Sequence, residues 1–241
     1  MFRFFYVIFM NLFRAPFMIT KMRRYADHPE EHSVEECYEL AKRVVDIVKG
    51  TGKITTEADG MENLPEEGGY LLYPNHQGKY DALGIIYSHE KPLTFIADDL
   101  VSHGILIREF IDLVRGGRIK KRDLKQTLTL FKEYSARVRD GEKCIIFPEG
   151  GYYPGKKNQL SEFKPGSFKL AIMSKAPIVP VAIYDSYKPF NSMKFGPVRT
   201  YVRYLKPIPY EEYAGKRTFQ IADMVRERIS TALEEMRKEI A

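Results

Sequence analysis

The sequence predicts an α/β domain with a single mixed, largely parallel sheet flanked by helices, and an N-terminal interfacial helical anchor. Two observations predict the domain: short apolar segments alternate with amphipathic ones, and several apolar segments end in turns rich in Pro or Gly. A third predicts the anchor, because residues 1–26 hold basic and aromatic side chains and no acid. We therefore expect amphipathic membrane-interface helices over 1–26 and the α/β domain over 27–241.

The N-terminal segment favours contact with an anionic membrane surface. Its longest apolar run, Phe4–Met10, is far shorter than the ~20 residues that span a bilayer. Basic residues follow this run in place of a small-residue cleavage site, which disfavours a signal peptide. Pro16 is expected to divide the segment into two short helices. The residues that carry this interpretation are Arg3, Arg14, Lys21, Arg23 and Arg24 with Phe2, Phe4, Phe5, Phe9, Phe13 and Phe17.

The first half of the domain has clear boundaries. Residues 27–33 form a polar linker, and Ser33 with Glu36 forms a capping box for a helix that ends at Gly50. A strand is expected over 53–57, a loop over 60–69, and an apolar strand over 70–73 that stops at Pro74.

The second half continues the alternation. We expect strands over 93–97, 143–147, 178–184 and 198–205, and helices over 105–114, 124–139, a short stretch ending near 175, and 218–240. Asp123 and Thr218 are the expected N-caps. The basic segment 116–123 is expected to be a loop: Gly116 and Gly117 would let its backbone approach a ligand, and a solvated basic loop is the alternative. Residues 152–161 form a second loop, with Lys156 and Lys157.

Composition limits the classes of function. The chain of 241 residues is 44% hydrophobic, enough for a buried core. Its two cysteines, Cys37 and Cys144, lie far apart, so neither a disulfide framework nor a zinc site is expected, and a reducing compartment fits. The net charge of +6 falls in two separate patches without a nucleic-acid-binding module, so no nucleic-acid partner is expected.

One pair of residues indicates acid–base chemistry. His76 follows the strand that ends at Pro74, and Asp81 lies five residues on. A carboxylate on one imidazole nitrogen fixes the tautomer and stabilises the imidazolium. On a straight helix such residues point ~140° apart, so they meet only if His76 lies in a turn before the helix, which Gly78 would let be tight. The alternative is a histidine with a structural role only.

Four segments stand in one order: NHQGKYD, GGRIKKR, FPEGG and IVPVAI. In this order they resemble the glycerophospholipid acyltransferase family, and within it the bacterial 1-acyl-sn-glycerol-3-phosphate acyltransferases, over roughly residues 50–210. The first and third segments match N-H-x4-D and F-P-E-G, and Phe163-Lys164-x-Gly166 is similar to the family's F-K-x-G. Two positions depart from it: Gly78 stands where the family has Ser or Thr, and Gly151-Tyr152 where it has Thr-Arg or Ser-Arg.

The resemblance implies a fatty acyl transfer from an acyl thioester to the hydroxyl of 1-acylglycerol-3-phosphate, giving phosphatidic acid for phospholipid synthesis. His76 would be the general base and Asp81 its partner. The implied substrate-binding residues are Asn75, Lys121, Arg122, Glu149, Gly150, Gly151 and Lys164. The missing arginine makes Lys121, Arg122, Lys156 and Lys157 its possible substitutes.

The implied partners are acyl-CoA or acyl carrier protein as donor, a lysophospholipid acceptor, and a membrane surface that residues 1–26 contact. No metal and no cofactor are expected. The expected location is the cytoplasmic face of the membrane, as a peripheral or monotopic protein. Alternatives are transfer to another lyso-lipid, a His/Asp hydrolase of lipid esters or thioesters, and a non-catalytic membrane protein. The donor, chain length, exact acceptor and oligomeric state are left open.

Overall fold

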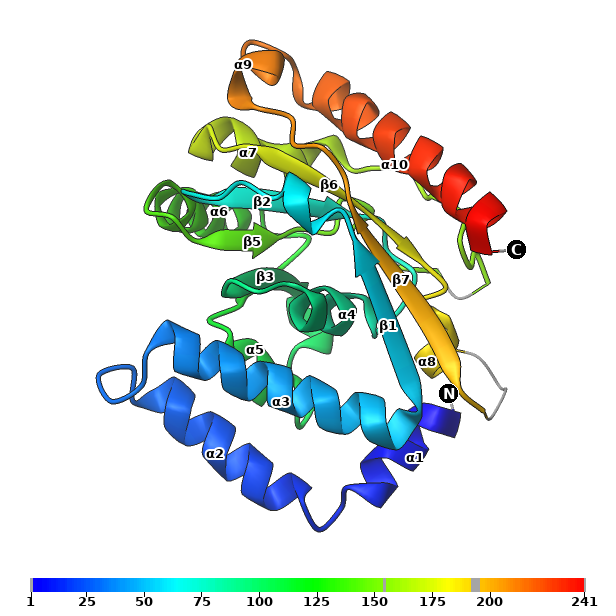
Figure 1. Ribbon diagram of the computed structural model, residues 1–241. Coiled ribbons are helices and arrows are strands. Elements are labelled where there is room, and N and C mark those ends of the chain that lie inside the picture. Colours follow the sequence, from blue (N-terminus) through cyan, green and yellow to red (C-terminus); the bar gives the residue numbers. More distant parts are fainter. Residues whose placement is uncertain (1, 154, 192–195, 241) are drawn as a thin grey trace.

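A computed structural model describes residues 2–153, 155–191 and 196–240, and its centre is one sheet (Figure 1). The strands lie in the order β1-β7-β6-β2-β5-β3-β4. Every pairing between them is parallel except β6 with β7, which confirms the mixed, largely parallel sheet. The strands are β1 Ile54–Asp59, β2 Tyr70–Pro74, β3 Leu93–Asp98, β4 Gly117–Ile119, β5 Lys143–Ile145, β6 Ile178–Tyr184 and β7 Val198–Tyr204.

Helices cover both faces of the sheet. One core lies under α6, α7 and α10, and the other under α2, α3, α4 and α5 (Figure 1). Strand β2 serves both, because Leu71 and Tyr73 face the first core while Tyr70 and Leu72 face the second. The helices are α1 Phe2–Met10, α2 Ala15–Asp27, α3 Val34–Gly52, α4 Asp81–Ser88, α5 Ile107–Leu113, α6 Leu124–Arg139, α7 Lys169–Ser174, α8 Lys188–Asn191, α9 Tyr210–Tyr213 and α10 Thr218–Ile240.

The predicted helix ends are confirmed in part. Ser33 Oγ accepts from the Glu36 N–H at 3.1 Å while the Glu36 carboxylate accepts from the Ser33 N–H at 2.9 Å, the predicted capping box. Asp123 caps α6 as predicted, accepting from the Gln126 N–H at 3.0 Å. Thr218, by contrast, is the first residue of α10 and not its N-cap. Helix α3 continues to Gly52, because the left-handed residue that ends it is Lys53 and not Gly50.

The segment 116–123 differs from the predicted loop. Residues Gly117–Ile119 form β4 and pair with the end of β3. A Cβ on Gly117 would lie 3.0 Å from the Tyr134 ring. Glycine at this position therefore leaves room for the Tyr134 side chain to pack against the strand. The predicted loop was therefore wrong over Gly117–Ile119, whereas the approach of a ligand to this backbone stays a prediction.

The N-terminal segment forms two helices, as predicted. Pro16 lies in the first turn of α2, and α1 and α2 meet at a bend of 86°. No single helix in the described ranges is long and apolar enough to cross a bilayer, although α1 and α2 together would be. Helix α1 packs on α8 through Phe4 and Phe190, whose ring centroids are 5.4 Å apart. The outer faces of the pair leave Phe2, Phe5, Phe9, Phe13 and Phe17 exposed.

A buried histidine, His89, lies at the end of α4. Its Nδ1 is 2.7 Å from the carbonyl oxygen of Lys91, and its Nε2 is 2.7 Å from the Tyr70 hydroxyl. Because a carbonyl only accepts, Nδ1 carries the proton and Nε2 accepts from Tyr70. The imidazole is therefore neutral, and burial lowers the pKa of His89 to about 4.

This histidine predicts how stability depends on pH. In the unfolded chain His89 takes up a proton near its ordinary pKa of 6.5, whereas the folded protein resists it until about 4. The contribution of His89 to the free energy of unfolding is complete above pH 6.5 and is lost as the pH falls towards 4. The total loss at the lower pH is about 3 kcal/mol. We expect His89→Gln to reduce this loss, measured as urea unfolding free energies at neutral and mildly acid pH. The exposed His28→Gln should keep the wild-type slope; equal slopes for all three proteins would contradict the prediction.

Candidate functional site

The candidate site lies where three neighbouring strands end. His76 follows β2, Glu149 follows β5, and Asp185 follows β6; both β5 and β6 pair with β2 in parallel. Their carboxyl ends therefore meet at one edge of the sheet, where open α/β folds bind ligands. The backbone N–H of His76 donates to Glu149 Oε1 at 2.9 Å, so the first and third sequence segments touch.

His76 and Asp81 form the predicted pair. His76 Nδ1 is 2.6 Å from Asp81 Oδ2, and Asp81 is the buried first residue of α4. The same oxygen accepts the backbone N–H groups of Gln77 at 2.5 Å and Gly78 at 2.9 Å. The turn before α4 thus brings together two residues that a straight helix would separate. Three donors thus converge on one oxygen of Asp81 at the N-terminus of α4.

The rest of the His76 ring lies against aromatic side chains. Its centroid is 4.2 Å from Phe147 in a stacked arrangement and 5.1 Å from Tyr152 in an edge arrangement, which leaves 17% of the side chain exposed. With Nδ1 on Asp81, the nitrogen left to exchange a proton is Nε2. No residue in the described part of the chain forms a hydrogen bond with it. The arrangement is that of a general base with one partnered and one accessible nitrogen.

Two residues expected to contact substrate also hold this turn in place. Glu149 is buried, and its two oxygens accept from the backbone N–H groups of His76 and Ser161, at 2.9 and 3.2 Å. Burial raises the pKa of Glu149. Asn75 exchanges two hydrogen bonds with the backbone of Ile183, at 2.7 and 3.0 Å, where β2 has ended. Contact of Asn75 or Glu149 with a substrate stays a prediction.

Two of the predicted cationic residues lie beside Gly150 and Gly151. A Cβ built on Gly151 would lie 3.8 Å from Lys121 Nζ, and one on Gly150 would lie 3.4 Å from Lys164 Cγ. Both glycines have positive φ, 69° and 154°. Lys121 is also paired with Asp98 at the end of β3. Arg122 is exposed, and no ion pair joins it to any described residue.

A polar network behind the turn was not predicted from the sequence. Gln77 Nε2 donates to Asn158 Oδ1 at 3.0 Å, and that oxygen also accepts from the backbone N–H of Asp185 at 2.8 Å. Gln77 Oε1 accepts from the Ser186 N–H at 2.9 Å. Only the position of Gln77 beside His76 could have indicated this role.

Gly78 does not have the conformational role in the turn that the sequence predicted. Its φ is not positive, so the turn does not depend on glycine's conformational freedom. A Cβ there would lie 2.9 Å from Asn191 Nδ2, an atom that donates to the Gln77 carbonyl oxygen at 3.3 Å. A side chain at this position would therefore have to displace the Asn191 amide of α8.

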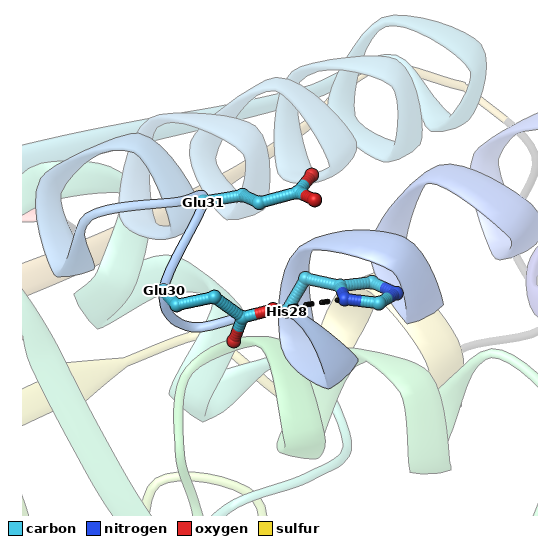
Figure 2. A group of neighbouring side chains, drawn as sticks. All are labelled: His28, Glu30 and Glu31. Atoms are coloured by element: carbon cyan, nitrogen blue, oxygen red, sulfur yellow. Dashed lines mark hydrogen bonds and ion pairs between the residues drawn. The ribbon is translucent and has the colours of Figure 1, made fainter.

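Among the residues that the structure describes, one group of side chains has ligand atoms close enough to hold a metal ion. It consists of His28, Glu30 and Glu31 in the turn between α2 and α3 (Figure 2). All three are exposed; His28 Nδ1 lies 3.1 Å from Glu30 Oε1, and Glu31 is paired with Arg24 at 3.4 Å. None of them belongs to the candidate site. The expectation that the site uses no metal stays a prediction.

Comparison with known proteins identifies the family. Residues 55–184, which include the turn and the Glu149 segment, match the model of the family described as Acyltransferase. A probable 1-acyl-sn-glycerol-3-phosphate acyltransferase of Mycoplasma pneumoniae is 29% identical over 183 residues, covering 73% of this chain and 66% of that protein. The 1-acyl-sn-glycerol-3-phosphate acyltransferase alpha of Homo sapiens is 25% identical over 195 residues, covering 76% and 65%. The chain thus spans slightly less than two thirds of these relatives' length.

A solved structure agrees on the fold. The crystal structure of the 1-acyl-sn-glycerophosphate (LPA) acyltransferase PlsC from Thermotoga maritima superposes with a TM-score of 0.72 at 17% identity, covering 93% of this chain and 97% of that one. The match confirms the single sheet with flanking helices. The family model covers more than half of the sequence, from β1 to the end of β6. This chain therefore belongs to the Acyltransferase family.

Proposed function

We propose that this protein is a 1-acylglycerol-3-phosphate O-acyltransferase, which moves a fatty acyl group from an acyl thioester to the free hydroxyl and forms phosphatidic acid. The observation that carries the proposal is the 2.6 Å contact between His76 Nδ1 and Asp81 Oδ2 within the matched family region. The activity for which the two relatives are named supports this acceptor. Family membership supports an acyl donor and a lysophospholipid acceptor in general.

The chemistry needs one base and no covalent enzyme intermediate. His76 Nε2 takes the proton of the acceptor hydroxyl as its oxygen forms a bond to the thioester carbonyl carbon. Asp81 stabilises the imidazolium through Nδ1. The tetrahedral intermediate then collapses, the carbon–sulfur bond breaks, and the thiolate receives the proton from the imidazolium. The products are phosphatidic acid and a free thiol, so atoms and charge balance.

Binding of the phosphate is assigned to Lys121 and Lys164. Both lie beside Gly150 and Gly151, close to the turn that holds His76. Lysine presents a point charge to phosphate, whereas the family's arginine presents a fork, and here Tyr152 occupies that position. Burial raises the pKa of Tyr152, so its hydroxyl stays a neutral donor. The backbone N–H groups near Gly150 and Gly151 are the proposed donors to the tetrahedral oxyanion.

The proposed location is the cytoplasmic face of a membrane, with α1 and α2 as the interfacial anchor. Phe13, at the bend between them, is 96% exposed, and Phe9 and Phe17 are also exposed. Basic residues on the same segment suit anionic headgroups. Helix α1 also lies close to the site, since Lys79 Nζ is 4.7 Å from the Phe4 ring centroid. Both the acyl chain and the product partition into a bilayer.

The experiment is acyl transfer by the detergent-purified full chain, with labelled acyl-CoA or acyl carrier protein thioester and 1-acylglycerol-3-phosphate. We expect a diacyl product that requires the acceptor. A product formed only with another lyso-lipid would mean that this lyso-lipid is the acceptor and that Tyr152 determines acceptor specificity. Free fatty acid without acceptor would favour a hydrolase. If the thioester stays intact in every assay while the protein still binds vesicles, the result would favour a non-catalytic membrane protein.

A further inference from the structure

A second apolar surface lies outside the N-terminal helices. Residues 99–107 connect β3 to α5 and include the first residue of α5, and in this segment Leu100 and Ile105 are 87% and 75% exposed. Val101 and Ile107 are also exposed. Side chains of this size rarely stand together in water without a partner. We call residues 99–107 the apolar loop.

The backbone holds the apolar loop with its hydrophobic side chains outward. Leu106 has a φ of 72°, which is costly for a residue with a Cβ, and its own side chain packs on the core. The buried Glu109 carboxylate accepts from the Leu106 N–H at 2.7 Å and fixes this conformation. Ile105 therefore points outward because the fold positions it there.

The apolar loop is joined to the proposed anchor. The other oxygen of Glu109 accepts from the Arg23 guanidinium of α2 at 2.6 Å. Met18 and Ile19 of α2 pack on the same core as Leu106. The loop and α2 therefore form one continuous part of the surface.

The charges around the apolar loop suit anionic headgroups. The acids beside and within it are engaged: Asp98, the last residue of β3, pairs with Lys121, and Asp99 Oδ1 lies 3.1 Å from His103 Nε2. Cations dominate the neighbouring segments. The exposed ones are Arg108, Lys120, Lys121, Arg122 and Lys125. An apolar centre with a basic rim is typical of surfaces that enter the boundary between headgroups and acyl chains.

We propose that the apolar loop inserts into an anionic lipid bilayer as a second membrane contact, in addition to α1 and α2. Lys121 couples the loop to the site, since it pairs with Asp98 at one side and lies beside Gly151 at the other. A lipid phosphate could then pass from the bilayer to Lys121 without crossing bulk water. Only this last point rests on the proposed function.

The test uses the absence of tryptophan from the chain. Ile105→Trp in the full protein places a single indole on the apolar loop, and Phe219→Trp places one at an exposed position on α10, on the other face of the sheet. Vesicles of phosphatidylcholine and phosphatidylglycerol, with bromine on the acyl chains, are the probe. We expect a blue shift and bromine quenching for Ile105→Trp and neither for Phe219→Trp.

Emission from Ile105→Trp that stays unshifted and unquenched would overturn the proposal; sedimentation with the vesicles would then assign binding to α1 and α2 alone. A blue shift without vesicles that grows with protein concentration would also overturn it, in favour of a second copy of this chain. The double variant Leu100→Ser/Ile105→Ser should lower vesicle affinity about tenfold, with Phe219→Ser unchanged. These readouts need no turnover, so they are independent of the acyl transfer assay.

Discussion

Replacement of His76 by asparagine is expected to lower kcat for acyl transfer about 10³-fold, the contribution of a positioned general base. The asparagine amide can still donate to Asp81 where Nδ1 now lies 2.6 Å away, so the buried carboxylate keeps a partner. It has no group that can take the acceptor's proton at the position of Nε2. We therefore expect a folded protein, with wild-type melting temperature and nearly unchanged KM, that turns over very slowly.

A second histidine–carboxylate pair supplies the matched control. His28 lies 3.1 Å from Glu30 and is exposed, so His28→Asn removes an equivalent contact without touching the turn. This variant should keep the wild-type rate. Turnover of His76→Asn within about tenfold of wild type would mean that another group acts as the base.

Replacement of Asp81 by asparagine is expected to lower kcat by about 10²- to 10⁴-fold; in serine proteases a neutral amide in place of the triad carboxylate costs about 10⁴. The asparagine oxygen can still accept the N–H groups of Gln77 and Gly78. What is lost is the negative charge that stabilises the imidazolium. The measurement is single-turnover acyl transfer with saturating acceptor.

Two further variants separate chemistry from folding. Asp81→Ala leaves two backbone N–H groups unsatisfied and should lower the unfolding free energy by about 2–4 kcal/mol, while Asp81→Asn should lower it much less. The double variant His76→Asn/Asp81→Asn should be no slower than His76→Asn alone, because the pair acts as a unit. Additive losses in kcat would show that Asp81 acts on the reaction independently of His76.

The sequence was most informative where function and fold use the same short segment. The apolar strand β2, its end at Pro74 and the spacing of His76 and Asp81 were sufficient to predict a turn that joins the pair. Strand β4 was missed because three residues that begin with glycine carry no strand pattern. Its existence depends on pairing with β3, which is a tertiary effect.

The supporting contacts of the site could not be predicted from the sequence, for a related reason. Glu149 and Asn75 bond to backbone groups, and every residue except proline has the same N–H, so no side-chain pattern marks such a partner. Asn158 and Gln77 meet across 81 positions of the chain, in a loop whose sequence indicates only flexibility. The outward position of Ile105 depends on one backbone angle at Leu106, which sequence does not specify.

The first helix has a consequence for handling the protein. Arg3 is buried, and its guanidinium donates to the carbonyl oxygens of Lys188, Pro189 and Gly196 at 3.3, 3.4 and 2.6 Å. Helix α8 in turn carries Asn191, which reaches the backbone beside His76. Trimming the N-terminus to improve solubility would expose these carbonyl groups and loosen the turn that holds His76. Affinity tags and labels therefore belong at the other end of the chain, after α10, which contributes none of these carbonyl groups.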